Sequence, residues 1–299
     1  MKTLGSLGFP YRAPTHPTTV ERRPAVRRTG PDYDTAWARR WPARVARVLA
    51  VEGLMRPAVA VLGSPERCGL DRLDGLEGPA IFAANHHSHL DTPLMLTSIP
   101  EPWRHRLVVG AAADYFFAGR VSGAVSALAM GAIPIERTKV TRRSADLAAS
   151  LIGEGWSMLI FPEGGRSPDG WGQPFRGGAA YLSARCGVPV VPVHLAGTGG
   201  VLRKGDRLPV PGSTTVTFGT PLRPVDGEDT RRFAARIERE VAALGDEATT
   251  DWWTARRRAH AGATPSLSGP SAGAWRRAWS LGERNRGRRR PRPRWPDLR

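Results

Sequence analysis

The stretch that decides the fold is Ile81-Phe82-Ala83-Ala84-Asn85-His86-His87-Ser88-His89-Leu90-Asp91. It begins as a short run that is apolar at every position, which is typical of a strand buried on both faces of a parallel sheet. It continues as a polar loop, and Pro93 suits the first turn of a helix that follows. A strand, a loop and a helix in this order are the unit from which α/β domains are built.

The same alternation continues along the middle of the chain. The strand-like runs are 79–84, 106–112, 131–135, 157–161, 189–195 and 214–218. The helix-like stretches are 92–98, 114–128, 141–154, 176–186 and 228–244. We therefore predict an α/β domain with a mixed, largely parallel sheet flanked by helices. Pro189 and Pro192 suggest that the run at 189–195 is an edge strand or contains a bulge.

An amphipathic helical segment is expected ahead of this domain core. Residues 35–62 carry apolar side chains at helical spacing among arginines, and Pro57 should break or kink the run near its middle. Two short helices would result. The pattern leaves open whether their apolar faces cap the core or face a membrane.

The domain organisation follows from these patterns and from composition. We place the main folded domain at 35–250, with its motif-bearing core at 79–220. Residues 1–34 are rich in Pro, Arg and Thr and are predicted to be a disordered basic segment. Residues 255–299 are predicted to be a disordered Arg-rich tail.

The formal net charge of +17 lies in the two ends of the chain. Residues 1–47 hold 10 basic and 3 acidic residues, and residues 252–299 hold 13 basic and 2 acidic residues, whereas residues 48–251 are close to neutral. Basic ends indicate an anionic partner, either acidic lipid headgroups or nucleic acid, unless they are simply solvated tails. Tryptophans among the C-terminal arginines resemble interfacial anchors: Trp275, Trp279 and Trp295.

The chain has no run of about 18 uninterrupted apolar residues, so no spanning helix is expected. The N-terminus lacks the apolar core of a signal peptide. Cys68 and Cys186 form no disulfide framework and have no metal-ligand spacing. These features fit a cytoplasmic protein. If it works on lipid it must visit the membrane surface, and we then expect it peripherally on the inner face of the cell membrane.

His86 and Asp91 are the first candidate catalytic residues. Residues five apart on an ideal helix point about 140° away from each other, so this pair can meet only through the loop. Asp91 could then accept the Nδ1 proton and leave Nε2 as a base toward a hydroxyl. Two alternatives stay open. Ser88 and Asp91 match a helix capping box, and the neighbouring histidines are of the type that binds zinc.

A second motif follows the strand expected at 157–161. It reads Phe161-Pro162-Glu163-Gly164-Gly165-Arg166-Ser167. The two glycines permit positive φ and close backbone approach, so the turn can form an anion-binding nest. Arg166 adds a guanidinium that can bind phosphate through two hydrogen bonds. An exposed turn with no ligand remains the alternative for this motif taken alone.

Four motifs in order resemble the glycerolipid acyltransferase family, whose bacterial members acylate 1-acylglycerol-3-phosphate (lysophosphatidate). The family's Asn-His-x-Ser-x-x-Asp is matched by 85–91, and its Gly-x-Ile-x-x-x-Arg by 131–137. Its Phe-Pro-Glu-Gly-Thr-Arg-Ser is matched by 161–167 except at Gly165. A Val-Pro-Val strand follows at 191–193, and a Phe-Lys-x-Gly element has its counterpart in Phe175-Arg176-Gly177-Gly178.

This resemblance implies an acyltransferase that needs no metal or organic cofactor. His86 would be the general base on the acceptor hydroxyl and Asp91 would orient it, with direct attack on the acyl thioester and no acyl-enzyme. The family's substrate-binding role carries over to Arg137, Glu163, Gly164 and Arg166. The acyl donor would be acyl-CoA or acyl carrier protein, the product phosphatidate in phospholipid biosynthesis, and the further partner an anionic membrane surface bound through the basic ends.

Gly165 departs from the family pattern, because the threonine hydroxyl is missing. The acceptor could therefore be another lyso-lipid or an amino-acid-derived lipid. A basic protein that binds membranes or nucleic acid through its ends is the non-enzymatic alternative. The middle of the chain has no recognisable nucleic-acid module, so no specific nucleic acid is expected.

Overall fold

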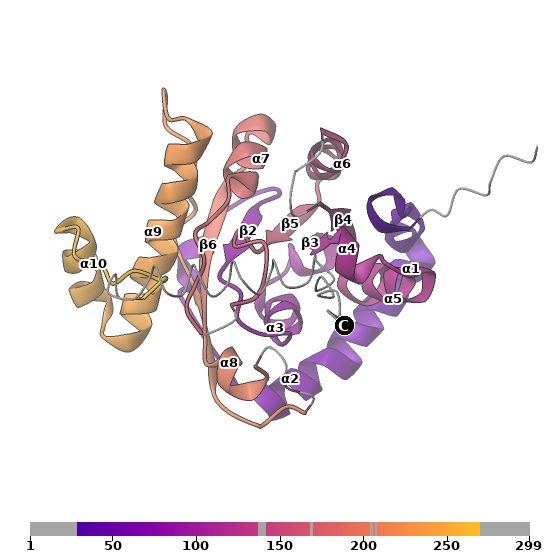
Figure 1. Cartoon of the computed structure of the whole chain (residues 1–299), viewed down its shortest axis with the longest axis horizontal. Coiled ribbons are helices and arrows are strands. Elements are labelled where there is room, and N and C mark those ends of the chain that lie inside the picture. The colour runs from indigo at the N-terminus through magenta and orange to yellow at the C-terminus, as the bar shows by residue number, and fades with distance from the viewer. Residues whose placement is uncertain (1–28, 137–141, 168–169, 204–205, 207, 270–299) are drawn as a thin grey trace, which may run out of the picture.

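The computed structural model describes residues 29–136, 142–167, 170–203, 206 and 208–269 (Figure 1). Within them the strands are β1 (Pro65–Cys68), β2 (Ile81–Ala84), β3 (Leu107–Ala112), β4 (Ala132–Ile135), β5 (Ser157–Ile160), β6 (Val190–Ala196) and β7 (Thr214–Phe218). They form one sheet in the order β1-β7-β6-β2-β5-β3-β4. Every neighbouring pair is parallel except β6 and β7, which confirms the predicted α/β class with a mixed, largely parallel sheet.

Helices cover both faces of this sheet (Figure 1). One face packs against α2 (Arg56–Gly63) and α3 (Asp91–Ser98). The other packs against α6 (Arg142–Gly153), α7 (Gly178–Cys186) and α9 (Thr230–Thr249). Phe82 of β2 points into the first layer and Ile81 into the second. This two-sided burial is why the strand is apolar at successive positions.

The remaining helices lie at the edges of this sheet or in the connections between its strands. They are α1 (Trp41–Leu49), α4 (Ala113–Phe116), α5 (Arg120–Met130), α8 (Thr198–Val201) and α10 (Trp252–His260), with short turns η2 (Gly30–Asp32), η3 (Ala36–Arg39), η5 (Leu70–Leu73) and η6 (Arg104–Arg106). The stretch expected as one helix at 114–128 is therefore two helices, α4 and α5, and Gly119 is the N-cap of the second.

The N-terminal helical segment is continuous through the proline. Helices α1 and α2 are joined by η4 (Ala50–Met55), a π-helical segment that ends just before Pro57. The wider π turn accommodates a residue that has no N–H to donate. One side of the segment caps the core through Val51 and Val59. The other side exposes apolar residues: Trp41, Val45, Leu49, Leu54 and Val61.

Strand β6 lies inside the sheet, so the prediction of an edge strand was wrong. The alternative was a bulge in this run, but the extra residue lies in the segment after β7, next to Pro192. The β6–β7 pairing ends at Val193 and Phe218, and an isolated bridge joins Val190 to Leu222. Between these two points, residues 219–221 lie opposite residues 191–192. In this irregular stretch Gly219 N donates to Pro192 O over 2.8 Å, and no regular ladder bond is required of the proline nitrogen.

The order of the C-terminal region extends beyond the predicted boundary. We expected disorder from residue 255, but α10 continues to His260 and the described chain to residue 269. At the other end, η2 begins at Gly30, inside the segment expected to be disordered up to residue 34. The basic ends at 1–28 and 270–299, with Trp275, Trp279 and Trp295, lie outside the described residues. Among the helices that are described, none combines the length and the apolar character needed to cross a bilayer.

Candidate active site

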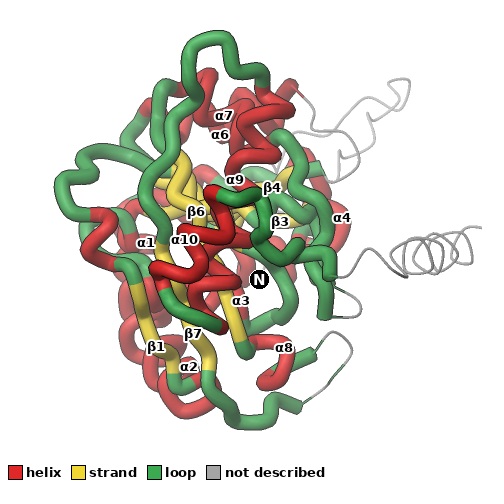
Figure 2. The backbone as a smooth tube through the Cα atoms, turned by 90° about the vertical axis from the view of Figure 1, so that its left-hand side faces the viewer, coloured by secondary structure: helices red, strands yellow, loops and turns green. Residues whose placement is uncertain are grey.

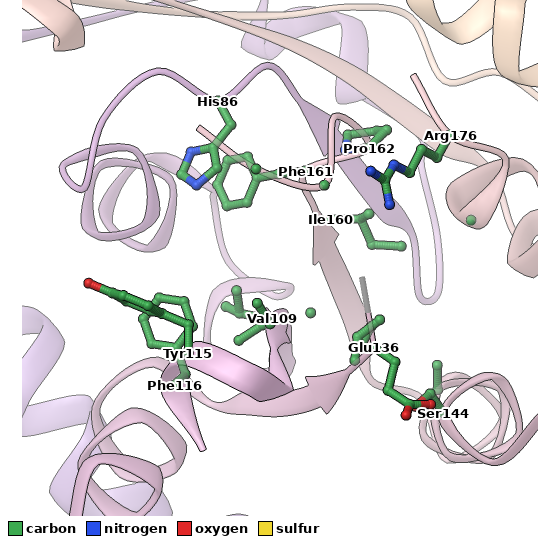
Figure 3. A pocket seen from close by; sticks show the side chains of 18 of the residues that line it. His86, Val109, Tyr115, Phe116, Glu136, Ser144, Ile160, Phe161, Pro162 and Arg176 are labelled. Carbon is green, nitrogen blue, oxygen red and sulfur yellow. The ribbon is translucent and has the colours of Figure 1, made fainter. Parts of the chain in front are cut away.

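The predicted motifs meet at the carboxyl ends of the central parallel strands, where open α/β sheets bind their ligands. A cavity of about 240 Å³ opens there. His86, Phe161 and Arg176 line one wall, and Tyr115, Phe116 and Glu136 line the opposite wall (Figure 3). Its floor is mainly apolar and includes Val109, Gly110, Ala145, Ala148, Ile160 and Leu182. The cavity can therefore take a hydrocarbon chain beside a histidine.

His86 and Asp91 are in direct contact, as their spacing across the loop predicted. His86 Nδ1 lies 2.8 Å from Asp91 Oδ2. The Asp91 side chain is fully buried, whereas the His86 side chain is 17% exposed and lines the cavity. Because Nδ1 is bound to the carboxylate, Nε2 is the ring nitrogen available to a molecule in the cavity. A neutral imidazole in this tautomer can accept a proton from a hydroxyl.

Asp91 is held by the start of α3, of which it is the first residue. Its Oδ2 also accepts hydrogen bonds from His87 N at 2.7 Å and Ser88 N at 2.8 Å. A helix N-terminus favours negative charge, so the same position stabilises the carboxylate. The bond to Ser88 N is one half of the predicted capping box, while Ser88 Oγ instead accepts from Leu90 N. Capping and orientation of the histidine are therefore combined in one side chain.

Two further side chains of the first motif fix the loop to the rest of the fold. Asn85 makes two hydrogen bonds with Leu195 of β6. Its Nδ2 donates to Leu195 O over 2.9 Å, and its Oδ1 accepts from Leu195 N at 2.7 Å. Ser88 Oγ donates to Leu202 O over 2.6 Å. These contacts span more than a hundred residues of sequence and place the loop independently of its own local conformation.

Residues of the second motif also contact His86. Ser167 N donates to His86 O over 2.8 Å, and Glu163 Oε1 accepts from His86 N at 2.9 Å. The Phe161 ring stacks on the imidazole with centroids 4.1 Å apart and planes 19° from parallel. The backbone and the ring of His86 are thus both fixed by residues that follow β5. Sequence patterns did not identify Phe161 as a partner of the histidine.

Glu163 was predicted to bind the substrate. Its side chain is 1% exposed and is not part of the cavity wall. Its second oxygen, Oε2, accepts from Gln173 N at 3.0 Å, so the carboxylate bridges the first motif and the loop after the second. Burial raises the pKa of Glu163 to about 7, against the two backbone hydrogen bonds, which lower it. The residue is placed to position His86.

Two arginines flank the turn of the second motif. Arg166, which was predicted, and Arg176, which was not among the predicted site residues, both line the cavity. Arg176 N donates to Pro162 O over 3.0 Å. Gly164 has φ +72°, and a Cβ on it would lie 2.9 Å from Arg176 Cζ. The guanidinium therefore occupies the space of the missing side chain. The resemblance of Phe175-Arg176 to the family's Phe-Lys element was the signal that could have identified it.

The remaining positions of the predicted site are Arg137, Gly165 and His89. Arg137 lies outside the described residues. Gly165 lines the cavity, and a Cβ built on it meets no heavy atom within 4 Å. His89 also lines the cavity, and its pKa is lowered by burial and by the nearby Arg166 and His86. No group of three or more His, Cys, Asp or Glu side chains in the described part of the chain is arranged to hold a metal ion.

Comparison with known proteins gives a consistent assignment. A family model described as Acyltransferase matches residues 64–196. The chloroplastic 1-acyl-sn-glycerol-3-phosphate acyltransferase BAT2 of Brassica napus is 34% identical over 140 residues, which cover 46% of this chain and 38% of that protein. The human 1-acyl-sn-glycerol-3-phosphate acyltransferase alpha is 27% identical over 179 residues, which cover 58% of this chain and 61% of that protein. Both matches span less than two thirds of the relative.

The fold has a counterpart among solved structures. The 1-acyl-sn-glycerophosphate (LPA) acyltransferase PlsC from Thermotoga maritima superposes with a TM-score of 0.55 at 21% identity. The match covers 72% of this chain and 86% of that one. Residues 64–196 of this chain are therefore similar to acyltransferase domains, and the fold is similar to that of the solved PlsC structure.

Proposed function

We propose that this protein transfers a fatty acyl group from an acyl thioester to the free hydroxyl of 1-acylglycerol-3-phosphate, giving phosphatidate. The thioester is acyl-CoA or acyl carrier protein. The observation that carries the proposal is the 2.8 Å contact between His86 Nδ1 and the buried Asp91 carboxylate, beside an apolar cavity. The names of the similar proteins support the choice of acceptor.

In the proposed reaction His86 Nε2 removes the proton from the acceptor hydroxyl as its oxygen attacks the thioester carbonyl. Asp91 stabilises the imidazolium that forms. The tetrahedral intermediate collapses with cleavage of the carbon–sulfur bond, and the departing thiolate takes the proton from His86. The new ester bond replaces the thioester bond and the imidazole returns to its neutral state, so no covalent acyl-enzyme is required.

The acceptor phosphate is proposed to bind at the turn around Gly164. Arg166 belongs to this turn, the Arg176 guanidinium lies next to Gly164, and both arginines line the cavity. Guanidinium groups bind phosphate oxygens in pairs of charge-assisted hydrogen bonds. Arg137 keeps its proposed role in substrate binding on the basis of the motif, and Gly164 serves by leaving room for Arg176. The apolar floor would hold the acyl chain.

Arg166→Ala and Arg176→Ala are each expected to raise the KM for lysophosphatidate about 10- to 100-fold, because each removes charge-assisted hydrogen bonds to the phosphate. The change in kcat should be smaller. Initial rates of thiol release from an acyl-CoA at varied lysophosphatidate concentrations measure both constants. Arg232→Ala, on an exposed arginine of α9, is the matched loss of one positive charge.

Monoacylglycerol, which lacks the phosphate, separates binding of the phosphate from a general defect. Its weak acylation should be the same in both variants and in the parent protein. An unchanged KM for lysophosphatidate in both variants would remove the phosphate site proposed here.

A second acceptor class is favoured by Gly165. The space beside it is open on the cavity wall, where a threonine would stand in the family motif. A lyso-lipid with a larger headgroup, or an amino-acid-derived lipid, could use this room. The same thiol-release assay with a panel of lyso-lipids decides between the two classes by the ratio of kcat/KM values.

The lipid substrates require contact with a membrane surface. We propose that the exposed stripe of α1, η4 and α2 (Trp41, Val45, Leu49, Leu54 and Val61) lies on the bilayer, since its opposite side packs on the core. The basic ends would add attraction to anionic lipids. Under this proposal the protein works peripherally at the cytoplasmic face of the cell membrane.

A further inference from the structure

Helix α10 presents two tryptophans, an arginine and a histidine on one face. At about 100° per residue, Trp252, Trp253, Arg257 and His260 fall within an arc of about 140°. Arg256 lies in the same arc but is ion-paired with Glu240 of α9. Trp252 is 49% exposed and Trp253 is 67% exposed, and their ring centroids are 6.1 Å apart. The opposite side of the helix carries the fully buried Ala255. The face is therefore a compact aromatic and cationic patch.

This patch is held in place by the fold. Asp251 caps the helix by accepting from Thr254 N at 2.9 Å. Arg256 and Arg258 form ion pairs with Glu240 and Asp246 of α9, at 2.9 Å and 2.7 Å. The helix is the outermost element on its side of the molecule, as Figures 1 and 2 show from two directions. The tryptophans are thus presented outward by an anchored helix.

We propose that this face of α10 is a docking site for an anionic lipid surface, distinct from the stripe of α1, η4 and α2, which lies on another side of the molecule (Figure 1). Tryptophan side chains favour the interface between headgroups and hydrocarbon, and arginines next to them bind lipid phosphates. The sequence after α10 continues the same composition, since residues 270–299 contain 10 arginines, 3 tryptophans and only 2 acidic residues. Burial of two adjacent exposed indole rings in the lipid interface also removes apolar surface from water, which lowers the free energy of the bound state.

Other occupants fit the face less well. A carrier protein bringing the acyl thioester would have to dock near His86, whereas α9 separates α10 from the cavity (Figure 1). A second copy of this chain, packed on the same face, would offer the exposed Arg257 no acidic partner, because none of the residues in this face is acidic. An anionic bilayer satisfies the indole rings and the positive charges together.

The test compares binding of the full chain to vesicles of phosphatidylcholine with and without phosphatidylglycerol. Trp252→Ala combined with Trp253→Ala should weaken partitioning to the anionic vesicles at least about 10-fold, as expected for two interfacial anchors. Arg257→Glu should reduce the preference for phosphatidylglycerol. Val225→Ala, an exposed apolar residue outside these elements, is the control and should bind like the parent chain. Thermal unfolding midpoints check that each variant is folded.

The result is separable from the proposed enzymatic activity. Thiol release in detergent micelles should be unchanged in the tryptophan variant, because α10 takes no part in the cavity. Equal vesicle binding by the parent chain and the tryptophan variant would overturn the inference. So would a parent dimer that light scattering shows to dissociate in the variant while vesicle binding is retained, since the face would then join two copies.

Discussion

Replacing His86 by alanine is expected to lower kcat for acyl transfer about 10³- to 10⁴-fold, with KM values for acceptor and donor changing only a few fold. General base catalysis by a positioned histidine contributes up to about 10⁴ in rate. The His86 side chain touches the cavity with its Nε2 side, while its backbone is fixed by Glu163 and Ser167. Its removal therefore deletes the base and leaves the cavity in place.

The measurement is thiol release from acyl-CoA with lysophosphatidate, at equal protein concentration and confirmed folding. His89→Ala is the matched control, because His89 lines the same cavity but makes no contact with Asp91 among those that the structure records. It should retain most of the kcat. Asp91→Asn should lower kcat about 10²-fold or more, since the imidazolium loses its carboxylate. Near-normal kcat in His86→Ala would contradict the mechanism.

The second large effect is expected at Glu163, a residue that does not touch the cavity. Glu163→Ala should lower kcat about 10²-fold, because a displacement of a catalytic group by about 1 Å costs that much. It also leaves the N–H groups of His86 and Gln173 without their buried acceptor, at about 1–3 kcal/mol each in unfolding free energy. KM for lysophosphatidate should change little. A substrate-binding role would instead raise KM and spare kcat.

Glu163→Gln provides a more conservative readout in the same assay. Its amide keeps one acceptor oxygen but turns a donor toward the other backbone N–H, so kcat should fall here as well. Glu77→Gln, on an exposed glutamate, is the control for the loss of one negative charge. Full activity of Glu163→Gln together with a raised KM would show that Glu163 contacts the acceptor after all.

The pH dependence of stability gives an independent check on Glu163. Its pKa is about 7 in the folded chain against an ordinary value of 4.5, so the folded state holds the proton more tightly. The unfolding free energy should therefore fall as pH rises from about 4.5 to 7, by up to about 3 kcal/mol. His194 acts in the opposite direction, because burial lowers its pKa to about 4. The difference in unfolding free energy between the parent chain and Glu163→Gln, measured by urea unfolding at pH 5 and pH 8, isolates the contribution of the glutamate. A difference that is the same at both pH values would contradict the raised pKa of Glu163.

The sequence pattern predicted strands correctly where a strand is buried on both faces and is therefore apolar in composition. The runs around β2, β3 and β5 were recognised because strands covered on both faces are mainly apolar. β1 was missed, since Pro65-Glu66-Arg67-Cys68 forms an edge strand with two of its four residues exposed. The end of order at residue 255 was placed too early, because α10 is stabilised by its ion pairs with α9 and has little apolar periodicity of its own.

The sequence by itself determined the α/β class, the order of the motifs and the pairing of His86 with Asp91, because these depend on periodicity and on a spacing of a few residues. The tertiary structure alone showed that Glu163 accepts a hydrogen bond from His86 N and that Arg176 occupies the space above Gly164. These contacts join side chains or backbone atoms from separate loops, which meet because parallel strands end at one edge of the sheet. Which atoms then come within hydrogen-bond distance depends on three-dimensional packing that no local pattern encodes.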